Sequence, residues 1–497
     1  MNNILHLLGV NTSYLNRFIF TIIILNFWLS TSRAAARYVT IERQVYRNLE
    51  YQFIMTDNIN VFVMNQPYNE SSLHQNGAYF IKRTPNRAEI IESEDGISVL
   101  VKPGYQLQTG SESSSNPSTL IDGYFKSGNI VGVNRLYASQ QLKKDEQFHG
   151  DKGEWVSAYL YDAYVIYSAS PRHSFFGGRT ARNIGIPNEY SLFLSDNPYP
   201  YDHFGFSTSS DNFQFSWYFG RLNDMLGIDD EGLLIPIGET KTVRRYMSFQ
   251  RLDLKVSKRL QIGLSEATLY GGPDQTTAGA YVNPLNFYYL SQRNQNLQMN
   301  GSWQVNVFYY TPHNWALYLD FYIDDFIINN DEGIDDRGVH PDRLAIMSKI
   351  SIPDLGTSAT LTTLRYVRVW NETYVTYRNF ENWIYFSKGL GFPERSYEGL
   401  KLESSYLGSQ TWEINLSIEA WRQGDRSLHT TLVDETDHTF PAGPVTNGFR
   451  TLLDMQYLYK NLVFNLELVY DKTSSNIGSS SAISTIMGIN YTHNLNL

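Results

Sequence analysis

Apolar and polar residues alternate along many segments of the chain. Between residues 412 and 420, every even position is apolar, beginning at Trp412, and every odd position is polar or charged, as at Glu413 and Glu419. Successive side chains of a β-strand point to opposite faces, so the pattern predicts strands with one oily face and one wet face. The same alternation recurs in residues 213–219, 251–256, 315–324 and 461–470.

Two observations favour membrane strands over the strands of a soluble β-sandwich, which also alternate. The longest runs reach about 9–11 residues, the length of a tilted transmembrane strand, whereas soluble strands typically have ~5–6 residues. Near the C-terminus, an apolar stripe from Ile483 to Leu497 resembles the closing strand of outer-membrane barrels. Those closing strands usually end in an aromatic residue, whereas this one ends in Leu497.

A different spacing marks the segment that precedes the strands. Ile41, Val45, Leu49 and Phe53 recur every four residues, which predicts a helix rather than a strand. A second short helix is expected from about Pro67. Because a helical segment of this size forms a poor core alone, we expect it to pack against or inside another part of the protein.

The N-terminal residues predict secretion. Arg17 precedes an apolar run from Phe18 to Leu29, and small residues follow as far as Ala36. This order is typical of a secretory signal peptide, which we expect to be cleaved near Ala36. The apolar run is shorter than the ~20 residues of a membrane-spanning helix, which argues against an N-terminal anchor.

The composition supports a barrel. Aromatic residues make up 14% of the 497 residues and charged residues 18%, below the ~25% that is usual for soluble domains. The mean hydropathy is −0.35, which excludes a helical membrane protein. The chain has no cysteine, which excludes disulfides and a lipid-modified cysteine. Its net charge of −10 argues against a nucleic-acid partner.

These patterns divide the chain into three parts. We expect a signal peptide in residues 1–36, a helical plug segment in residues 37–95 and an antiparallel all-β transmembrane barrel in residues 96–497. At ~20–25 residues for each strand and its loop, the last part gives roughly 16–20 strands, and bacterial barrels use even numbers.

An ordered set of short segments between about residues 45 and 490 resembles the capsule-assembly Wzi family. The nearest match is the stretch at residues 245–252 and 263–271, where Gln250 stands in place of an expected His. The other matching segments are residues 45–50, 66–68, 176–179, 192–197, 283–284, 324–326, 388–391 and 440–443. The resemblance implies an 18-stranded barrel with a periplasmic plug. It also implies a lectin-like role in holding capsular polysaccharide on the cell surface.

One aromatic segment suggests a sugar-binding surface. Residues 370–386 mix aromatic rings, which can cover the C–H faces of sugars, with amides that can bond to hydroxyls. The alternative is the aromatic girdle that barrels carry at the membrane interfaces. The candidate polysaccharide-binding residues are Trp370, Asn371, Tyr374, Tyr377, Asn382 and Trp383.

Charged residues on the wet faces of predicted strands form a second group of candidates. Carboxylate pairs could serve as acid and base in glycoside hydrolysis, but polar barrel lumens hold carboxylates without any catalytic role. We interpret them as structural ion pairs in the lumen, in which Glu266 pairs with Arg245 or Arg251. The other members of the group are Asp320, Asp324, Glu413 and Glu419.

We therefore predict an outer-membrane barrel that binds or anchors surface polysaccharide. The alternatives are a polysaccharide-export or solute-diffusion porin and, third, an outer-membrane hydrolase, suggested by the neighbouring His173 and Ser174. We expect no enzymatic activity, catalytic residue, metal or cofactor. The expected partners are outer-membrane lipid, surface polysaccharide and, during biogenesis, the barrel-assembly machinery, and we expect a monomer.

Overall fold

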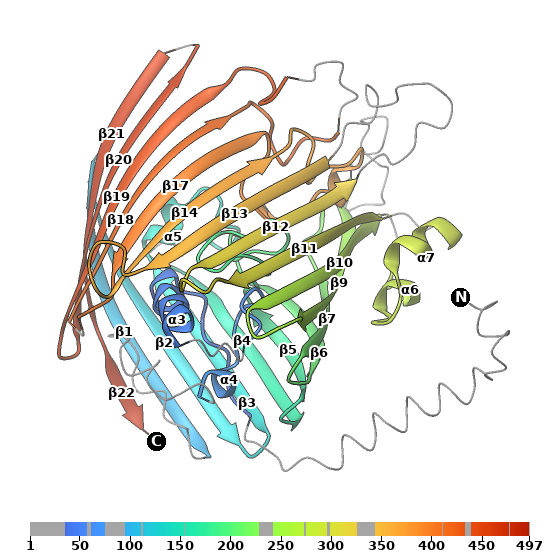
Figure 1. The fold of residues 1–497 in the computed structure, drawn as a ribbon, viewed down its shortest axis with the longest axis horizontal. Helices are drawn as coiled ribbons and strands as arrows, with labels where there is room; N and C mark the ends of the chain where they lie inside the picture. Colours follow the sequence, from blue (N-terminus) through green and yellow to red (C-terminus); the bar gives the residue numbers. More distant parts are fainter. Residues whose placement is uncertain are drawn as a thin grey trace.

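The protein folds as a closed antiparallel β-barrel (Figure 1). The computed structural model describes residues 35–56, 61–74, 95–110, 113–153, 155–227, 242–272, 275–295, 299–325, 343–409, 411–432, 439–476 and 478–496. Within these ranges the barrel wall contains 18 strands. The predicted fold class, an all-β barrel of about 18 strands with a small helical element at its N-terminal side, is confirmed.

The strands follow one another around the wall in chain order. The short strand β8 (Met225–Leu226) adds to the edge of β9, and β22 (His493–Asn496) continues β21, so the barrel closes where both β21 and β22 pair with β1. The wall strands are β1 (Gly96–Thr109), β2 (Ser114–Ser127), β3 (Ile130–Ser139), β4 (Ser157–Ser170), β5 (His173–Thr180), β6 (Tyr201–Ser209), β7 (Phe213–Arg221), β9 (Thr242–Lys255), β10 (Leu260–Gly272), β11 (Asn300–Tyr310), β12 (Ala316–Asp325), β13 (Arg343–Pro353), β14 (Thr360–Val369), β17 (Tyr397–Tyr406), β18 (Trp412–Gln423), β19 (Thr446–Tyr459), β20 (Leu462–Ser475) and β21 (Gly478–Tyr491).

The two ends of the barrel differ in their connections. At one end, which we call the turn end, strands are joined by short turns such as residues 128–129, 171–172 and 460–461. At the other, the loop end, long loops such as residues 140–156, 181–200, 370–396 and 424–445 join them. In outer-membrane barrels, the short turns face the periplasm and the longer loops face the outside of the cell.

The two faces of the wall match the alternation in the sequence. On β18, Trp412, Leu416 and Ile418 lie on the outer face and are between 39% and 44% exposed, whereas Glu413 and Ser417 point inward and are buried. In a membrane, the outer face meets lipid and the inner face needs polar partners. Within the described residues, no helix is long and apolar enough to cross a bilayer.

The N-terminal segment fills part of the barrel. Helix α3 (Arg43–Thr56) lies inside the wall, and the short helix α4 (Glu70–His74) follows near the turn end (Figure 1). The predicted helical stripe is buried, from Val45 to Phe53, and joins one apolar core with inward residues of the wall. We call residues 35–56 and 61–74 the plug.

The remaining short elements belong to the loops. The β3–β4 loop contains α5 (Gln141–Lys144). The β14–β17 loop contains the 3-10 helix η2 (Asn379–Glu381) and the strand pair β15 (Ile384–Tyr385) and β16 (Lys388–Gly389). The β10–β11 loop contains α6 (Gly279–Val282) and α7 (Tyr288–Gln295), which lie outside the barrel (Figure 1).

Candidate functional site

Buried ion pairs attach α3 to one side of the lumen wall. The Nη1 and Nη2 atoms of Arg47 lie 3.6 Å from Glu403 and 3.4 Å from Glu413, respectively. One turn further, Glu50 lies 2.9 Å from the Nζ of Lys349, and both side chains are 1% exposed. The prediction of a lumen ion pair at Glu413 is consistent with this arrangement, and its partner is the plug rather than another wall residue.

The β5–β6 loop enters the same charged side of the lumen. Glu189 lies 3.5 Å from both Arg365 and Lys401, and Arg365 also bonds to Glu419. Burial alone would raise the pKa of Glu189, but Lys401, Arg365 and Lys349 hold that pKa below its usual value. The loop and α3 are therefore held by one network of alternating charges.

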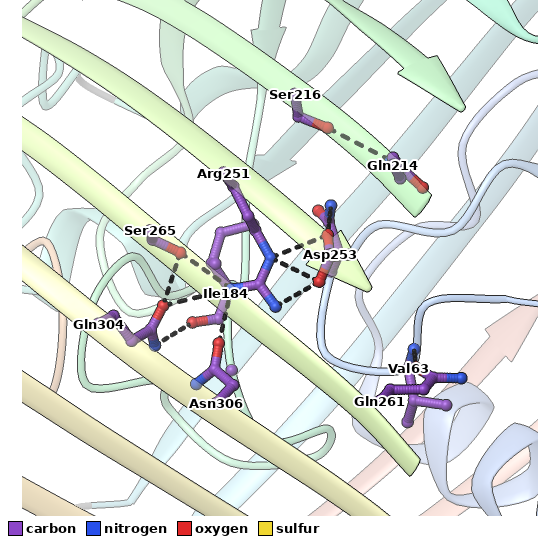
Figure 2. Close-up of polar contacts among 12 residues, drawn as sticks. Val63, Ile184, Gln214, Ser216, Arg251, Asp253, Gln261, Ser265, Gln304 and Asn306 are labelled. Atoms are coloured by element: carbon purple, nitrogen blue, oxygen red, sulfur yellow. Dashed lines mark hydrogen bonds and ion pairs between the residues drawn. The ribbon is translucent and has the colours of Figure 1, made fainter. Parts of the chain in front are cut away.

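A second polar network joins the β5–β6 loop to β9, β10 and β11 (Figure 2), and Asp320 extends this network to β12. The Arg251 guanidinium lies 2.6 Å from Asp253 and donates to Asn306 at 2.6 Å. Gln304 donates to the carbonyl oxygen of Ile184 and to Asp320, both at 2.8 Å. The Asp320 carboxylate therefore accepts hydrogen bonds from side-chain amides in this network.

Arg251 occupies its position because β10 has a glycine beside it. A Cβ atom at Gly263 would lie 2.0 Å from Nη2 of Arg251, so a larger residue would displace the guanidinium. The glycine at this register position leaves the space in which the buried cation meets its acceptors.

The β14–β17 loop folds inward and covers the lumen from the loop end. Trp383 donates from Nε1 to the carbonyl oxygen of Phe193 at 2.7 Å. The Tyr374 hydroxyl donates to the carbonyl oxygen of Leu192 at 2.6 Å. Both aromatic side chains are buried. Arg245 fixes the same loop by donating to the carbonyl oxygens of Phe380, Asn382 and Ile384.

These contacts bear on the aromatic candidates for sugar binding. Tyr374, Asn382 and Trp383 are buried in contacts between loops, so they present no surface to a sugar or to lipid as the structure stands. Trp370 and Asn371 are partly exposed at the loop end, where Arg368 lies 4.8 Å from the Trp370 ring. Tyr377 is partly exposed in the same loop.

The expected pairing of Glu266 with Arg245 or Arg251 is wrong. Its neighbour Ala267 faces the lumen core, so Glu266 points outward from β10. There its carboxylate accepts from Gln250 at 2.6 Å and from the backbone N–H of Tyr289 at 3.1 Å.

The β10–β11 loop covers this outer polar patch. The Tyr288 hydroxyl bonds to Ser248 at 2.8 Å and accepts from Trp217 at 3.1 Å. A carboxylate facing lipid would be costly, and α7 shields it by lying over the wall. The loop in turn exposes Leu285 (79%) and Phe287 (66%) on the outside.

The remaining candidate carboxylate contacts the inward loop. Asp324 accepts from the backbone N–H of Tyr374 at 2.9 Å and lies 3.9 Å from Arg343. Like Glu413, it contacts an element that fills the lumen, whereas Glu419 pairs with Arg365 of the wall. Among the described residues, no group of three or more His, Asp or Glu side chains is arranged to hold a metal ion.

Sequence reasoning missed a cluster of rings at the loop end. His149 stacks on Phe386 with ring centres 3.7 Å apart and planes 9° apart. The Tyr199 hydroxyl donates to Asp145 at 2.5 Å, and Lys388 lies 4.5 Å from the Tyr199 ring. We call these five residues the loop-end platform. They come from three separate loops, so no local spacing in the sequence could have grouped them.

Comparison with known proteins identifies solved structures that share this barrel fold. No family model and no curated protein matches the chain. Among solved structures, the chain aligns with Wzi of Escherichia coli, an outer membrane protein involved in group 1 capsule assembly and a carbohydrate-binding β-barrel, with a TM-score of 0.61 over 92% of this chain and 99% of Wzi. This chain has the fold of Wzi. The identity is 10%, so the resemblance to the Wzi family that the ordered motifs predicted is confirmed at the level of the fold.

Two further solved structures are barrels from Pseudomonas aeruginosa. OccD3 aligns with a TM-score of 0.47 and 14% identity over 80% of this chain and 92% of its own. OccK10 aligns with a TM-score of 0.46 and 10% identity over 81% of this chain and 100% of its own. The TM-score of the Wzi alignment is higher than either. The structure therefore shares its barrel fold with an outer membrane protein.

Proposed function

We propose that this outer-membrane barrel binds polysaccharide at its loop end and helps to hold it on the cell surface. The observation that carries the proposal is the filled lumen, in which the plug and two inward loops replace an open channel. A barrel of this strand number could otherwise enclose an aqueous pore. Wzi, which has the same fold, binds carbohydrate, and this also supports the proposal that the chain binds polysaccharide.

The loop-end platform has the chemistry that a sugar-binding surface needs. Stacked rings at His149 and Phe386 offer apolar faces to sugar C–H groups. Asp145 and Lys388 lie beside them and can bond to hydroxyls or to an acidic substituent. We therefore favour this platform over the buried part of the segment at residues 370–386.

Two porin functions are the alternatives. Solute diffusion would require a path past the buried pairs Arg47–Glu413 and Lys349–Glu50, and polysaccharide export would require the plug to leave. We infer that neither occurs in the state described here. Secretion through a signal peptide cleaved near Ala36 stays a prediction, because residues 1–34 lie outside the described residues.

The first test is deletion of the gene, with cell-bound and shed polysaccharide measured separately. We expect cell-bound polysaccharide to fall and shed polysaccharide to rise. Equal cell-bound amounts in the deleted strain and its parent would contradict the attachment function.

The second test locates the site by comparing two aromatic substitutions at the loop end. Phe386→Ala removes the ring that stacks on His149, so we expect binding of purified polysaccharide to weaken several-fold. Trp370→Ala removes the partly exposed ring of the segment predicted from the sequence, and we expect a smaller effect. A larger loss with Trp370→Ala would move the site away from the loop-end platform.

A further inference from the structure

A cavity of about 580 Å³ separates the plug from the barrel wall on the side away from the ion pairs. It reaches from the turn end toward the middle of the lumen, between plug residues 61–72 and the inward faces of β4, β5, β6 and β7. Gln214 and Ser216 share a hydrogen bond on this wall (Figure 2). Six serines line the wall side of the cavity: Ser168, Ser170, Ser174, Ser207, Ser209 and Ser210.

Arg182 is the buried cation of this cavity. It is 3% exposed and lines the cavity beside the rings of Tyr218 and Tyr38, which lie 4.1 Å and 5.0 Å from its guanidinium carbon. Its Nε donates to His203 at 3.1 Å. Within the described part of the chain, no carboxylate forms an ion pair with Arg182, and its Nη2 has no hydrogen-bond partner.

The charge of the cavity points to an anion. A buried cation is costly unless it is paired or hydrogen-bonded. Of the other buried arginines of the lumen, Arg47 and Arg251 meet carboxylates, and Arg245 donates to three carbonyl oxygens. Lys255 and Arg172 also line the cavity, whereas Asp211 is the single acidic side chain among the described residues that line it. This positive site stands out in a chain whose net charge is −10.

We infer that this cavity is a second binding site, on the periplasmic side, for an acidic oligosaccharide such as a uronate-containing segment. The hydroxyl wall would bond to sugar hydroxyls, the rings of Tyr38 and Tyr218 would cover C–H faces, and Arg182 would meet the carboxylate. The volume lies within the ~300–1,000 Å³ of small-molecule sites. This site lies at the opposite end from the loop-end platform and does not depend on it.

The test compares an acidic with a neutral sugar. A hyaluronan tetrasaccharide, which carries glucuronates, and the neutral, fully N-acetylated chitin tetrasaccharide are titrated calorimetrically against the full protein in detergent. We expect the acidic probe to bind and the neutral probe to bind about tenfold more weakly or not at all, because a charged hydrogen bond is lost. Equal binding of both probes, or binding of neither, would overturn the inference.

Substitutions assign the binding to this cavity. Arg182→Gln should reduce affinity for the acidic probe to that for the neutral one. Arg179→Gln, at a partly exposed arginine that is paired with Asp202 and does not line the cavity, should leave the affinity unchanged. Because Arg182→Gln could impair folding, Ser209→Leu provides an independent test by narrowing the cavity without removing charge. Heat-modifiable gel mobility checks that each variant is folded. An unchanged affinity in folded Ser209→Leu, or a loss caused by Phe386→Ala instead, would exclude this cavity.

Discussion

The two sides of the plug contact the barrel wall in different ways. Toward β13, β17 and β18, α3 is fixed by charged pairs that exclude water, with Lys349 and Glu50 each 1% exposed. Toward β4–β7, small hydroxyl side chains face the plug across a cavity of about 580 Å³. The charged side therefore specifies where the plug sits, because each buried charge is satisfied in one arrangement only. The hydroxyl side leaves room that water or a ligand can occupy.

The largest expected effect is on the charged side. Lys349→Ala would leave Glu50 buried without its cation, and breaking such a pair costs about 3–5 kcal/mol. The free energy of unfolding, measured by urea titration of the vesicle-folded protein, should fall by that amount. Protease should also reach α3 more readily. Adding Glu50→Gln to this variant should restore part of the loss, because the unpaired charge is then gone.

A matched control is the pair Arg450–Asp471, whose side chains are 54% and 38% exposed. Exposed pairs contribute little, so Arg450→Ala should change the free energy of unfolding by less than about 1 kcal/mol. If Lys349→Ala and Arg450→Ala had equal effects, the charged side would not be what holds the plug.

The barrel itself could be predicted from the sequence because its cause is local. The alternation at residues 412–420 places Trp412 toward lipid and Glu413 toward the lumen, as β18 does. The stripe from Val45 to Phe53 likewise becomes the buried face of α3. In both, the periodicity of one segment determines which side chains are buried, so no knowledge of distant partners is needed.

The site could be predicted only in part because its causes are contacts between distant segments. Glu266 was expected in the lumen on account of its charge, but the β10–β11 loop covers it on the outer wall. Trp383 and Tyr374 were expected at a surface, but their loop folds inward onto Phe193 and Leu192. No sequence pattern singled out Arg182, because the cavity that it lines is formed between distant segments of the chain.

The next prediction compares the same substitution, serine to leucine, on the charged side and on the hydroxyl side of the plug. Ser351 is buried on the charged side and donates to Glu50 at 2.6 Å, so Ser351→Leu would overpack a filled space and should cost about 1–3 kcal/mol. Ser209 faces the cavity, where a leucine has room, so Ser209→Leu should change the free energy of unfolding by less than about 0.5 kcal/mol. The same urea titration measures both. A similar cost at both serines would mean that the cavity side is packed as tightly as the charged side.

The smallest expected effect is a dependence on pH that belongs to the charged side alone. The pKa of Glu189 is held below its usual value by Lys401, Arg365 and Lys349, despite a burial that would raise it. A carboxyl group with a lowered pKa stabilises the folded state above its unfolded pKa of about 4.3, and this contribution is lost as the pH falls through the folded value.

Acid should therefore loosen the β5–β6 loop, and the conductance of the barrel in a planar bilayer should rise below about pH 4. Glu189→Gln removes this titration and should flatten the response in that range. Lys401 keeps its pair with Glu403, and Arg365 keeps its pair with Glu419, so the variant retains counter-charges for both cations. The same acid response in Glu189→Gln and in the parent would show that the pH dependence arises elsewhere. A response altered by Ser209→Leu would locate it on the cavity side, where the described lining residues include a single carboxylate, that of Asp211.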